Sequence, residues 1–299
     1  MAGSVVGILI AQLLVGQAVV AQEYEIRLHR ALDVGQKYNV VSKGSIRMDM
    51  IMNAAGEDDA EGVGDKTSFD LDFDVEVLAV NAKKAPTSVK AVVNKFTTQV
   101  KSTGEKTVAI KKGAVITGKV VDGEEEFEVD GEELDEEGVA SKIVSSTLSL
   151  ADNDFTDDDT FGTKNKVKVG DKWDVNAAMA AEDLKSSDIE VRKEDIKGSC
   201  TLKELVDVEG QKCLRIEADM MASSMKVPSL SGMKVNKASF RATMKGLFPV
   251  DTAKLPVEES IKVTMNITMA GPARKGEPAV TIDSKMVVIA DSKQKLLKP

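Results

Sequence analysis

Apolar and polar residues alternate along most of this chain, which is the pattern of β-strands that bury one face and expose the other to solvent. The clearest segment places Phe69, Leu71, Phe73, Val75 and Val77 on one side and a continuous row of Asp and Glu residues on the other. Such one-sided alternation is typical of antiparallel sheets rather than of parallel sheets, whose strands are apolar on both faces.

The same alternation predicts a series of strands, several of them long. They cover residues 38–52, 69–77, 89–100, 115–121, 124–129, 199–208, 212–221, 238–248, 263–269 and 280–288. Asp122-Gly123 and Glu209-Gly210 are turn signals that predict tight hairpins between neighbouring strands. Residues 53–66 are rich in Gly, Asp and Glu and predict a loose hairpin loop. Lys43 and Arg47 are expected to face the acidic row of the next strand.

Two segments depart from this alternation and predict helices. Residues 132–150 carry apolar side chains four or five positions apart, with acidic residues first and a lysine later, as an amphipathic helix does. Asn176 is a good N-cap for a short helix over residues 177–184. The acidic stretch 152–162 between them predicts a loop.

A repeated motif predicts the domain organisation. Val34-Gly35-Gln36-Lys37-Tyr38-Asn39-Val40 and Val169-Gly170-Asp171-Lys172-Trp173-Asp174-Val175 share the pattern V-G-x-K-aromatic-x-V, and each leads from a turn into an ordered element. We therefore expect an α+β fold that is mostly β, with long curved antiparallel sheets and two short covering helices. The predicted organisation is a first β-rich half over residues 22–150, ending in a helix, and a second over residues 151–299.

The N-terminus predicts export. The stretch Val5 to Val20 is almost continuously apolar, the first charged side chain is Glu23, and small residues precede a cleavage point after Ala21. Residues 1–21 thus have the features of a signal peptide, and the mature protein is expected in the periplasm or outside the cell. An uncleaved anchor is the alternative interpretation, since residues 1–22 just reach the roughly 20 residues that span a bilayer. No later apolar run is long enough to cross a membrane.

Charge and cysteine content limit the remaining function classes. A net charge of -9 argues against nonspecific binding of nucleic acid, which needs a basic surface. Cys200 and Cys213 are the two cysteines and form a candidate disulfide, because an exported chain meets oxidising conditions. A symmetric turn at Glu209-Gly210 places Cys213 opposite Val206, so this bridge requires a bulge or a slipped register. Two cysteines with no nearby histidine do not predict a metal site.

No catalytic motif is present. His29 is the single histidine and lies in a polar stretch, so it is interpreted as an incidental surface residue. The acidic run Asp152 to Asp159 suggests calcium, but Asp157 and Thr163 stand where an EF-hand requires Gly and Glu. We therefore expect no enzyme activity, no metal and no cofactor. A hydrolase that uses paired carboxylates is the alternative that the abundance of acids leaves open.

The methionines are the most distinctive chemical feature. Met48, Met50 and Met52 follow one face of a predicted strand, and Met265 and Met269 follow one face of another. Flexible thioether side chains suit an adaptable apolar cavity for a lipid or acyl chain, so these five are the candidate ligand-binding residues. Binding of copper(I) by thioethers and ordinary core filling in a chain with 4% aromatic residues are the alternatives.

One region resembles known proteins. The stretch Asp157 to Asn176, with its V-G-D-x-W motif, and the later Glu209-Gly210-Gln211-Lys212-Cys213 hairpin resemble segments of uncharacterised exported bacterial proteins. At the level of architecture, long curved strands with covering helices are similar to the half-barrels of periplasmic lipoprotein carriers.

Together these features predict a non-catalytic exported protein of the cell envelope. We expect it to bind an apolar ligand or a lipidated partner, such as a lipoprotein, on a concave sheet face. The alternatives are a structural module that docks an envelope protein and binds no small ligand, and a carboxylate-dependent hydrolase.

Overall fold

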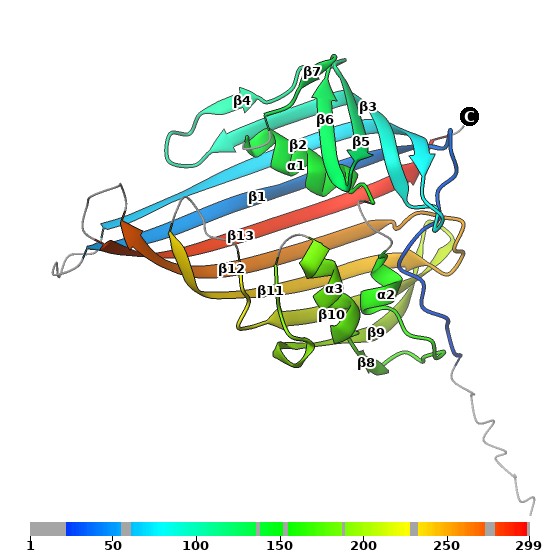
Figure 1. The fold of residues 1–299 in the computed structure, drawn as a ribbon. Coiled ribbons are helices and arrows are strands. Elements are labelled where there is room, and N and C mark those ends of the chain that lie inside the picture. The colour runs from blue at the N-terminus through cyan, green and yellow to red at the C-terminus, as the bar shows by residue number, and fades with distance from the viewer. Residues whose placement is uncertain are drawn as a thin grey trace, which may run out of the picture.

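The structure is a computed structural model that describes residues 22–54, 61–135, 138–151, 155–186, 189–227, 233–272 and 279–297. It confirms the predicted fold class: the chain is mostly β and forms one long open antiparallel sheet (Figure 1). The strands are β1 (Lys37–Ala54), β2 (Glu61–Val80), β3 (Pro86–Val100), β4 (Lys106–Val108), β5 (Val115–Val121), β6 (Glu124–Val129), β7 (Glu132–Glu133), β8 (Lys172–Asp174), β9 (Ile196–Val208), β10 (Gln211–Ala222), β11 (Lys234–Pro249), β12 (Glu258–Pro272) and β13 (Ala279–Leu296). The helices are α1 (Val139–Leu148), α2 (Asp157–Phe161) and α3 (Ala177–Ser186), with a 3₁₀ turn, η1 (Lys193–Asp195).

The first and last long strands pair at the centre of the sheet. The order is β7-β6-β5-β3-β2-β1-β13-β12-β11-β10-β9-β8, and β4 pairs with β3 beside this path. Strands of the first half of the chain thus lie on one side of the β1–β13 pair, and strands of the second half lie on the other. Neighbouring strands elsewhere are hairpins or near neighbours in sequence, whereas β1 and β13 come from opposite ends of the chain.

Alternation explains which face each strand buries. The five apolar residues of β2 predicted to point inward are at most 6% exposed, while the intervening acids lie at the outer surface. Asp70 in that outer row lies 3.6 Å from Lys43 of β1 and 2.6 Å from Lys95 of β3. The predicted contact of Lys43 is therefore present. The prediction for Arg47 is wrong, because its guanidinium pairs with Asp49 on its own strand.

The repeated motif adopts the same backbone arrangement in both halves. Gly35 and Gly170 have φ of 83° and 95°, a conformation that glycine adopts without steric cost. Each glycine N–H donates to a strand carbonyl, Val77 at 2.8 Å and Leu202 at 2.7 Å, and the same two residues donate back to the residue after the glycine. The motif therefore anchors the start of β1 against β2 and the start of β8 against β9.

The helices lie on one face of the sheet and cover its two flanks (Figure 1). Ile143, Val144 and Leu148 of α1 pack with the inner residues of β1, β2, β3, β5 and β6 in one buried cluster. Residues of α2, α3 and β8 to β11 form two further clusters on the other flank. The division into two halves at residue 150 stays a prediction, because one continuous sheet joins both sets of strands.

Helix boundaries differ from the predicted ones on the first flank. Residues 132–133 do not begin a helix, since the turn at Asp130-Gly131 continues the β6–β7 hairpin and Leu134 donates to the carbonyl of Phe127. The helix α1 is therefore shorter than predicted.

On the second flank, part of the predicted acidic loop folds as α2. Thr156 and Asp159 form a capping box at its N-terminus. Residues 152–154 of that loop lie outside the described part of the chain, as does the predicted signal peptide over residues 1–21. The predicted helix at 177–184 is confirmed as α3, and Asn176 Oδ1 accepts a hydrogen bond from the N–H of Met179 at 3.4 Å.

The two cysteines do not form the disulfide that the sequence suggested. Both are free and fully buried. Cys213 lies opposite Val206, as a symmetric turn requires, and Cys200 lies opposite Ala218, five residues further along β10. Five residues of a strand span roughly 17 Å, well beyond the separation that a disulfide bridges. The bulge in this hairpin falls between Arg215 and Ile216 and is too small to bring the cysteines together.

Candidate functional site

The inner face of the three central strands carries a continuous set of apolar side chains, which we call the central apolar face. Register places these residues in cross-strand rows through β1, β13 and β12. The rows are Ile46–Val288–Val263, Met48–Met286–Met265, Met50–Ser284–Ile267 and Met52–Ile282–Met269. All five methionines predicted to bind a ligand therefore lie on this one face, and Met286 joins them between Met48 and Met265.

This face is the part of the inner surface that the helices leave uncovered. Figure 1 shows α1 over the strands on one flank and α2 and α3 over those on the other, with β1, β13 and β12 passing between them. Met48, Met50 and Met52 are 43%, 38% and 44% exposed, whereas inner residues of β2 such as Phe73 are fully buried. The other members of the four rows are partly buried. The exposed methionines thus belong to a contiguous apolar surface, which in soluble proteins marks a binding site more often than an isolated exposed residue does.

Charge is absent from the four rows. Ser284 is their one polar member, and the described residues of β1, β12 and β13 in these rows carry no Asp, Glu, Lys or Arg. The charged residues of this part of the strands lie at alternate positions, where Asp49 and Lys285 are opposite each other on the outer face. The central apolar face therefore offers no fixed charge or ion pair to a bound molecule.

Polar groups gather at one end of the central apolar face. A cavity of about 310 Å³ lies there, lined among others by Tyr38, Ile261 and Ala290, by Glu259 at the start of β12, and by Arg30. Ile261 and Ala290 form the cross-strand pair next to the row of Ile46, so the cavity adjoins the central apolar face directly. A second cavity of about 400 Å³ shares Arg30 and lies toward α2 and α3.

Arg30 is buried and forms no ion pair with the residues that the structure describes. The residue is 7% exposed, and its Nη2 donates to the carbonyl oxygen of Pro249 at 2.8 Å, while Nε and Nη1 have no hydrogen-bond partner among the described residues. Burial lowers the pKa of its guanidinium, which nearby carboxylates partly offset. Burial of an unpaired charge is costly, so an unpaired arginine at a cavity indicates a place for an anion.

Two carboxyl groups near Arg30 have raised pKa values. Burial is the main cause at Glu259 and raises its pKa to about 7, with repulsion from Asp157 adding to the effect and Arg30 opposing it. Burial likewise raises the pKa of Asp157, against the opposing influence of His29. Both groups therefore hold protons more strongly than ordinary carboxyls, which weakens their repulsion of an incoming anion.

Sequence reasoning missed Arg30, although a signal was present. Residues 24–32 alternate like a strand, with Tyr24, Ile26, Leu28 and Leu32 buried and the residues between them facing outward. Arg30 occupies the one inward position of this row that is not apolar. His29 also lines both cavities, and its Nε2 lies 2.9 Å from the carbonyl oxygen of Lys83.

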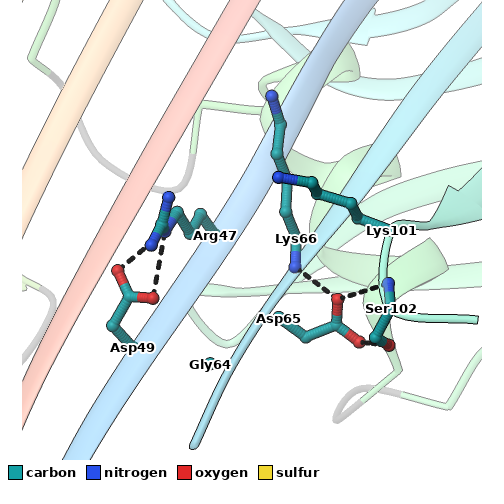
Figure 2. Close-up of a pocket in the computed structure, with 7 residues that line it drawn as sticks. All are labelled: Arg47, Asp49, Gly64, Asp65, Lys66, Lys101 and Ser102. Atoms are coloured by element: carbon teal, nitrogen blue, oxygen red, sulfur yellow. Dashed lines mark hydrogen bonds and ion pairs between the residues drawn. The ribbon is translucent and has the colours of Figure 1, made fainter.

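Two further pockets lie at the ends of the sheet. Figure 2 shows a polar pocket of about 260 Å³ near one end of β1 and β2, in which Asp49 binds Arg47 and Asp65 accepts a hydrogen bond from Ser102 Oγ at 2.6 Å. Both of its carboxylates are already paired. A pocket of about 810 Å³ lies at the opposite end of the sheet, where Lys254, Lys293 and Lys295 line it together with apolar residues of the strand ends.

Neither a metal centre nor a membrane-spanning helix is found in the described part of the chain. Among those residues, His, Cys, Asp and Glu side chains do not gather in groups of three or more that could hold a metal ion. Among the same residues, the helices are too short or too polar to cross a membrane.

Comparison with known proteins gives distant similarities alone. No family model matches the chain, and no curated protein matches it. Among solved structures, lipovitellin, in a structure titled for its lipid–protein interactions, is 7% identical with a TM-score of 0.32; the match covers 89% of this chain and 26% of that one. This chain thus spans about a quarter of the length of lipovitellin.

Two bacterial structures are similar at a still greater distance. A DUF1329 family protein from Desulfovibrio piger is 10% identical with a TM-score of 0.12, covering 88% of this chain and 87% of that one. A putative outer membrane lipoprotein-sorting protein domain from Vibrio parahaemolyticus is 6% identical with a TM-score of 0.13, covering 86% of each chain. Similarities of this size assign no function to this chain.

Proposed function

We propose that this protein is a non-catalytic, exported lipid-binding protein of the cell envelope, and that the central apolar face holds the acyl chains. The observation that carries the proposal is the set of four uncharged cross-strand rows left uncovered between two helix-covered flanks. Export rests on the apolar N-terminal stretch with small residues before its predicted cleavage point.

The dimensions of the central apolar face support an acyl chain as its occupant. From Ile46 to Met52 the rows extend six residues along the strand, roughly 20 Å, and three strands give a width of roughly 10 Å. One leaflet of a bilayer is about 15 Å of hydrocarbon thick, half of a core of about 30 Å. An extended acyl chain therefore fits within the length of the rows, and each methylene group that it buries contributes about 0.8 kcal/mol.

The side-chain chemistry favours a flexible ligand over a rigid one. Three of the six methionines in the rows are adjacent across the strands, with Met286 between Met48 and Met265, and Met52 and Met269 lie at the two ends of another row. Unbranched thioether side chains adapt to varied shapes at low energetic cost. Such a surface suits hydrocarbon chains of different length and unsaturation.

A binding assay on matched methionine variants tests the proposal. Met50→Asp places a charge in the rows, and Met221→Asp places the same charge on the outer face of β10, where the native methionine is similarly exposed at 48%. We expect Met50→Asp to weaken binding of a fluorescent fatty acid at least tenfold and Met221→Asp to leave it unchanged. Equal binding by both variants would contradict the proposal.

Native mass spectrometry supplies a test without any variant. The mature protein, purified from its host without detergent, should carry an additional mass that organic extraction releases as a lipid. A bare protein that also takes up no fluorescent fatty acid would favour the alternative of a protein-docking module. A lipidated protein released intact would identify the occupant as a lipoprotein.

A further inference from the structure

We propose that Arg30 binds the anionic head group of the ligand, a carboxylate or a phosphate, at the end of the central apolar face. This inference rests on the proposed function, because it assigns the chemical class of the molecule whose chains the rows hold. Its starting observation is independent: a buried guanidinium with two unpartnered nitrogen atoms lines a cavity of about 310 Å³.

The guanidinium is held in position by the backbone. Arg30 lies in the extended segment that crosses from one flank to the other, with Leu28 packed in a cluster of the second flank and Leu32 in the cluster of the first. Its Nη2 is fixed to the carbonyl oxygen of Pro249 at the end of β11. Because this bond uses one of the terminal nitrogens, Nε and Nη1 keep their donors for another acceptor.

No protein carboxylate takes that place in the structure. Asp158, Asp251 and Glu259 are near enough to influence Arg30 electrostatically, but none forms an ion pair with it in the described part of the chain. Asp158 is engaged elsewhere, since its Oδ1 accepts a hydrogen bond from the N–H of Leu28 at 2.6 Å. An anion placed there accepts charge-assisted hydrogen bonds from the guanidinium, which are stronger than those between neutral groups.

The cavity joins this donor pair to the apolar rows. Its wall includes Tyr38 and Val40 of β1, Ile261 of β12 and Ala290 of β13, all on the inner face that continues into the row of Ile46. A head group at Arg30 therefore leaves its chain directed along β1, β13 and β12. The ligand class that follows is an amphiphile with one anionic end, such as a fatty acid or a phospholipid.

The decisive experiment compares ligands of equal chain length and different head group on the unmodified protein. We expect palmitate to bind at least tenfold more tightly than hexadecanol, which has the same chain and no charge. Equal affinities would overturn the role of Arg30 while leaving the proposed function intact. Failure of both to bind would overturn the proposed function itself.

Variants then assign the preference to one side chain. Arg30→Gln should bind palmitate and hexadecanol equally, with the affinity for hexadecanol retained, and Arg27→Gln on the exposed side of the same segment should keep the preference. A preference that survives in Arg30→Gln would overturn the assignment. Circular dichroism confirms that each variant is folded, and the ligand comparison above stands if Arg30→Gln is not.

Titration with inorganic phosphate distinguishes a lipid head group from a free anion. Weak competition between phosphate and palmitate, at millimolar phosphate, is the expected result for a site that needs both chain and head group. Tight binding of phosphate, together with no uptake of palmitate, would show a site for free anions and overturn the inference in its lipid form.

Discussion

Gly44 of β1 lies directly opposite Phe69 of β2, and the aromatic ring covers the position that a side chain at residue 44 would need. A Cβ built on Gly44 would lie 2.5 Å from Cζ and 2.7 Å from Cε1 of that ring, and it would also meet the carbonyl oxygen of Ile289. The glycine therefore allows a buried phenylalanine of β2 to pack across β1.

We predict that Gly44→Ala destabilises the protein by about 1–3 kcal/mol, the usual cost of overpacking a core. The ring of Phe69, which is 6% exposed, must shift or the β1–β13 ladder must move. Urea unfolding of the variant and of the unmodified protein measures the difference in the free energy of unfolding.

Gly62→Ala is the matched control on the same hairpin. A Cβ at Gly62 has nothing within 4 Å, so this variant should change the free energy of unfolding by less than about 0.5 kcal/mol. Equal effects of the two substitutions would show that the contact with Phe69 does not constrain residue 44.

Local patterns predicted the strands well because one face of the sheet packs against the core and the other faces water. The alternation in β2 and the turns at Asp122-Gly123 and Glu209-Gly210 act over a few residues, and the structure has positive φ at all four turn positions. The helix predicted over residues 132–150 is shorter in the structure for a similar local reason. The Asp130-Gly131 turn extends a hairpin where the spacing of apolar residues predicted helix.

Long-range pairing was beyond the sequence patterns. Met48 lies opposite Met286, and no local signal specifies that β1 pairs with β13 across nearly the whole chain. Sequence reasoning therefore found the methionine faces one strand at a time but could not place them in common rows. Arg30 escaped notice for a different reason: residues 24–32 alternate like a strand, but a charged side chain at an inward position of that row was not expected to be buried.

We predict that Cys200 and Cys213 are reduced and unreactive in the native protein. Both are fully buried, and burial raises the pKa of the Cys200 thiol to about 12 and also raises that of Cys213. Because the thiolate is the reactive form, neither should react with a thiol reagent at pH 8. Two thiols should become titratable in denaturant without added reductant.

An exposed cysteine provides the positive control for that assay. Ser223→Cys introduces a thiol at an exposed position just after β10. In the native protein this thiol should react with the reagent quickly, while Cys200 and Cys213 do not react. Detection of no thiols in denaturant would mean that the cysteines are oxidised, and the register of β9 and β10 would then have to differ from the one described.

The raised pKa of Glu259 predicts a specific dependence of stability on pH. Its pKa in the folded protein is about 7, above the ordinary value of 4.5, so the folded state binds the proton more tightly than the unfolded state does. The resulting stabilisation is fully present below pH 4.5 and is lost as pH rises toward 7. The difference between the two pKa values corresponds to about 3 kcal/mol at most.

Glu259→Gln removes this titration while it keeps the shape of the protonated side chain. The variant and the unmodified protein should have similar stability near pH 4.5, and the variant should become the more stable of the two as pH approaches 8. Urea unfolding at several pH values measures the divergence.

Glu258→Gln is the control, since its exposed side chain faces the other side of β12 and pairs with Lys293. A constant difference between Glu259→Gln and the unmodified protein from pH 4.5 to 8 would show that folding does not raise the pKa of Glu259, which is then ionised at neutral pH. Arg30 would then already have a charged neighbour, and the case for an external anion at that end of the central apolar face would weaken.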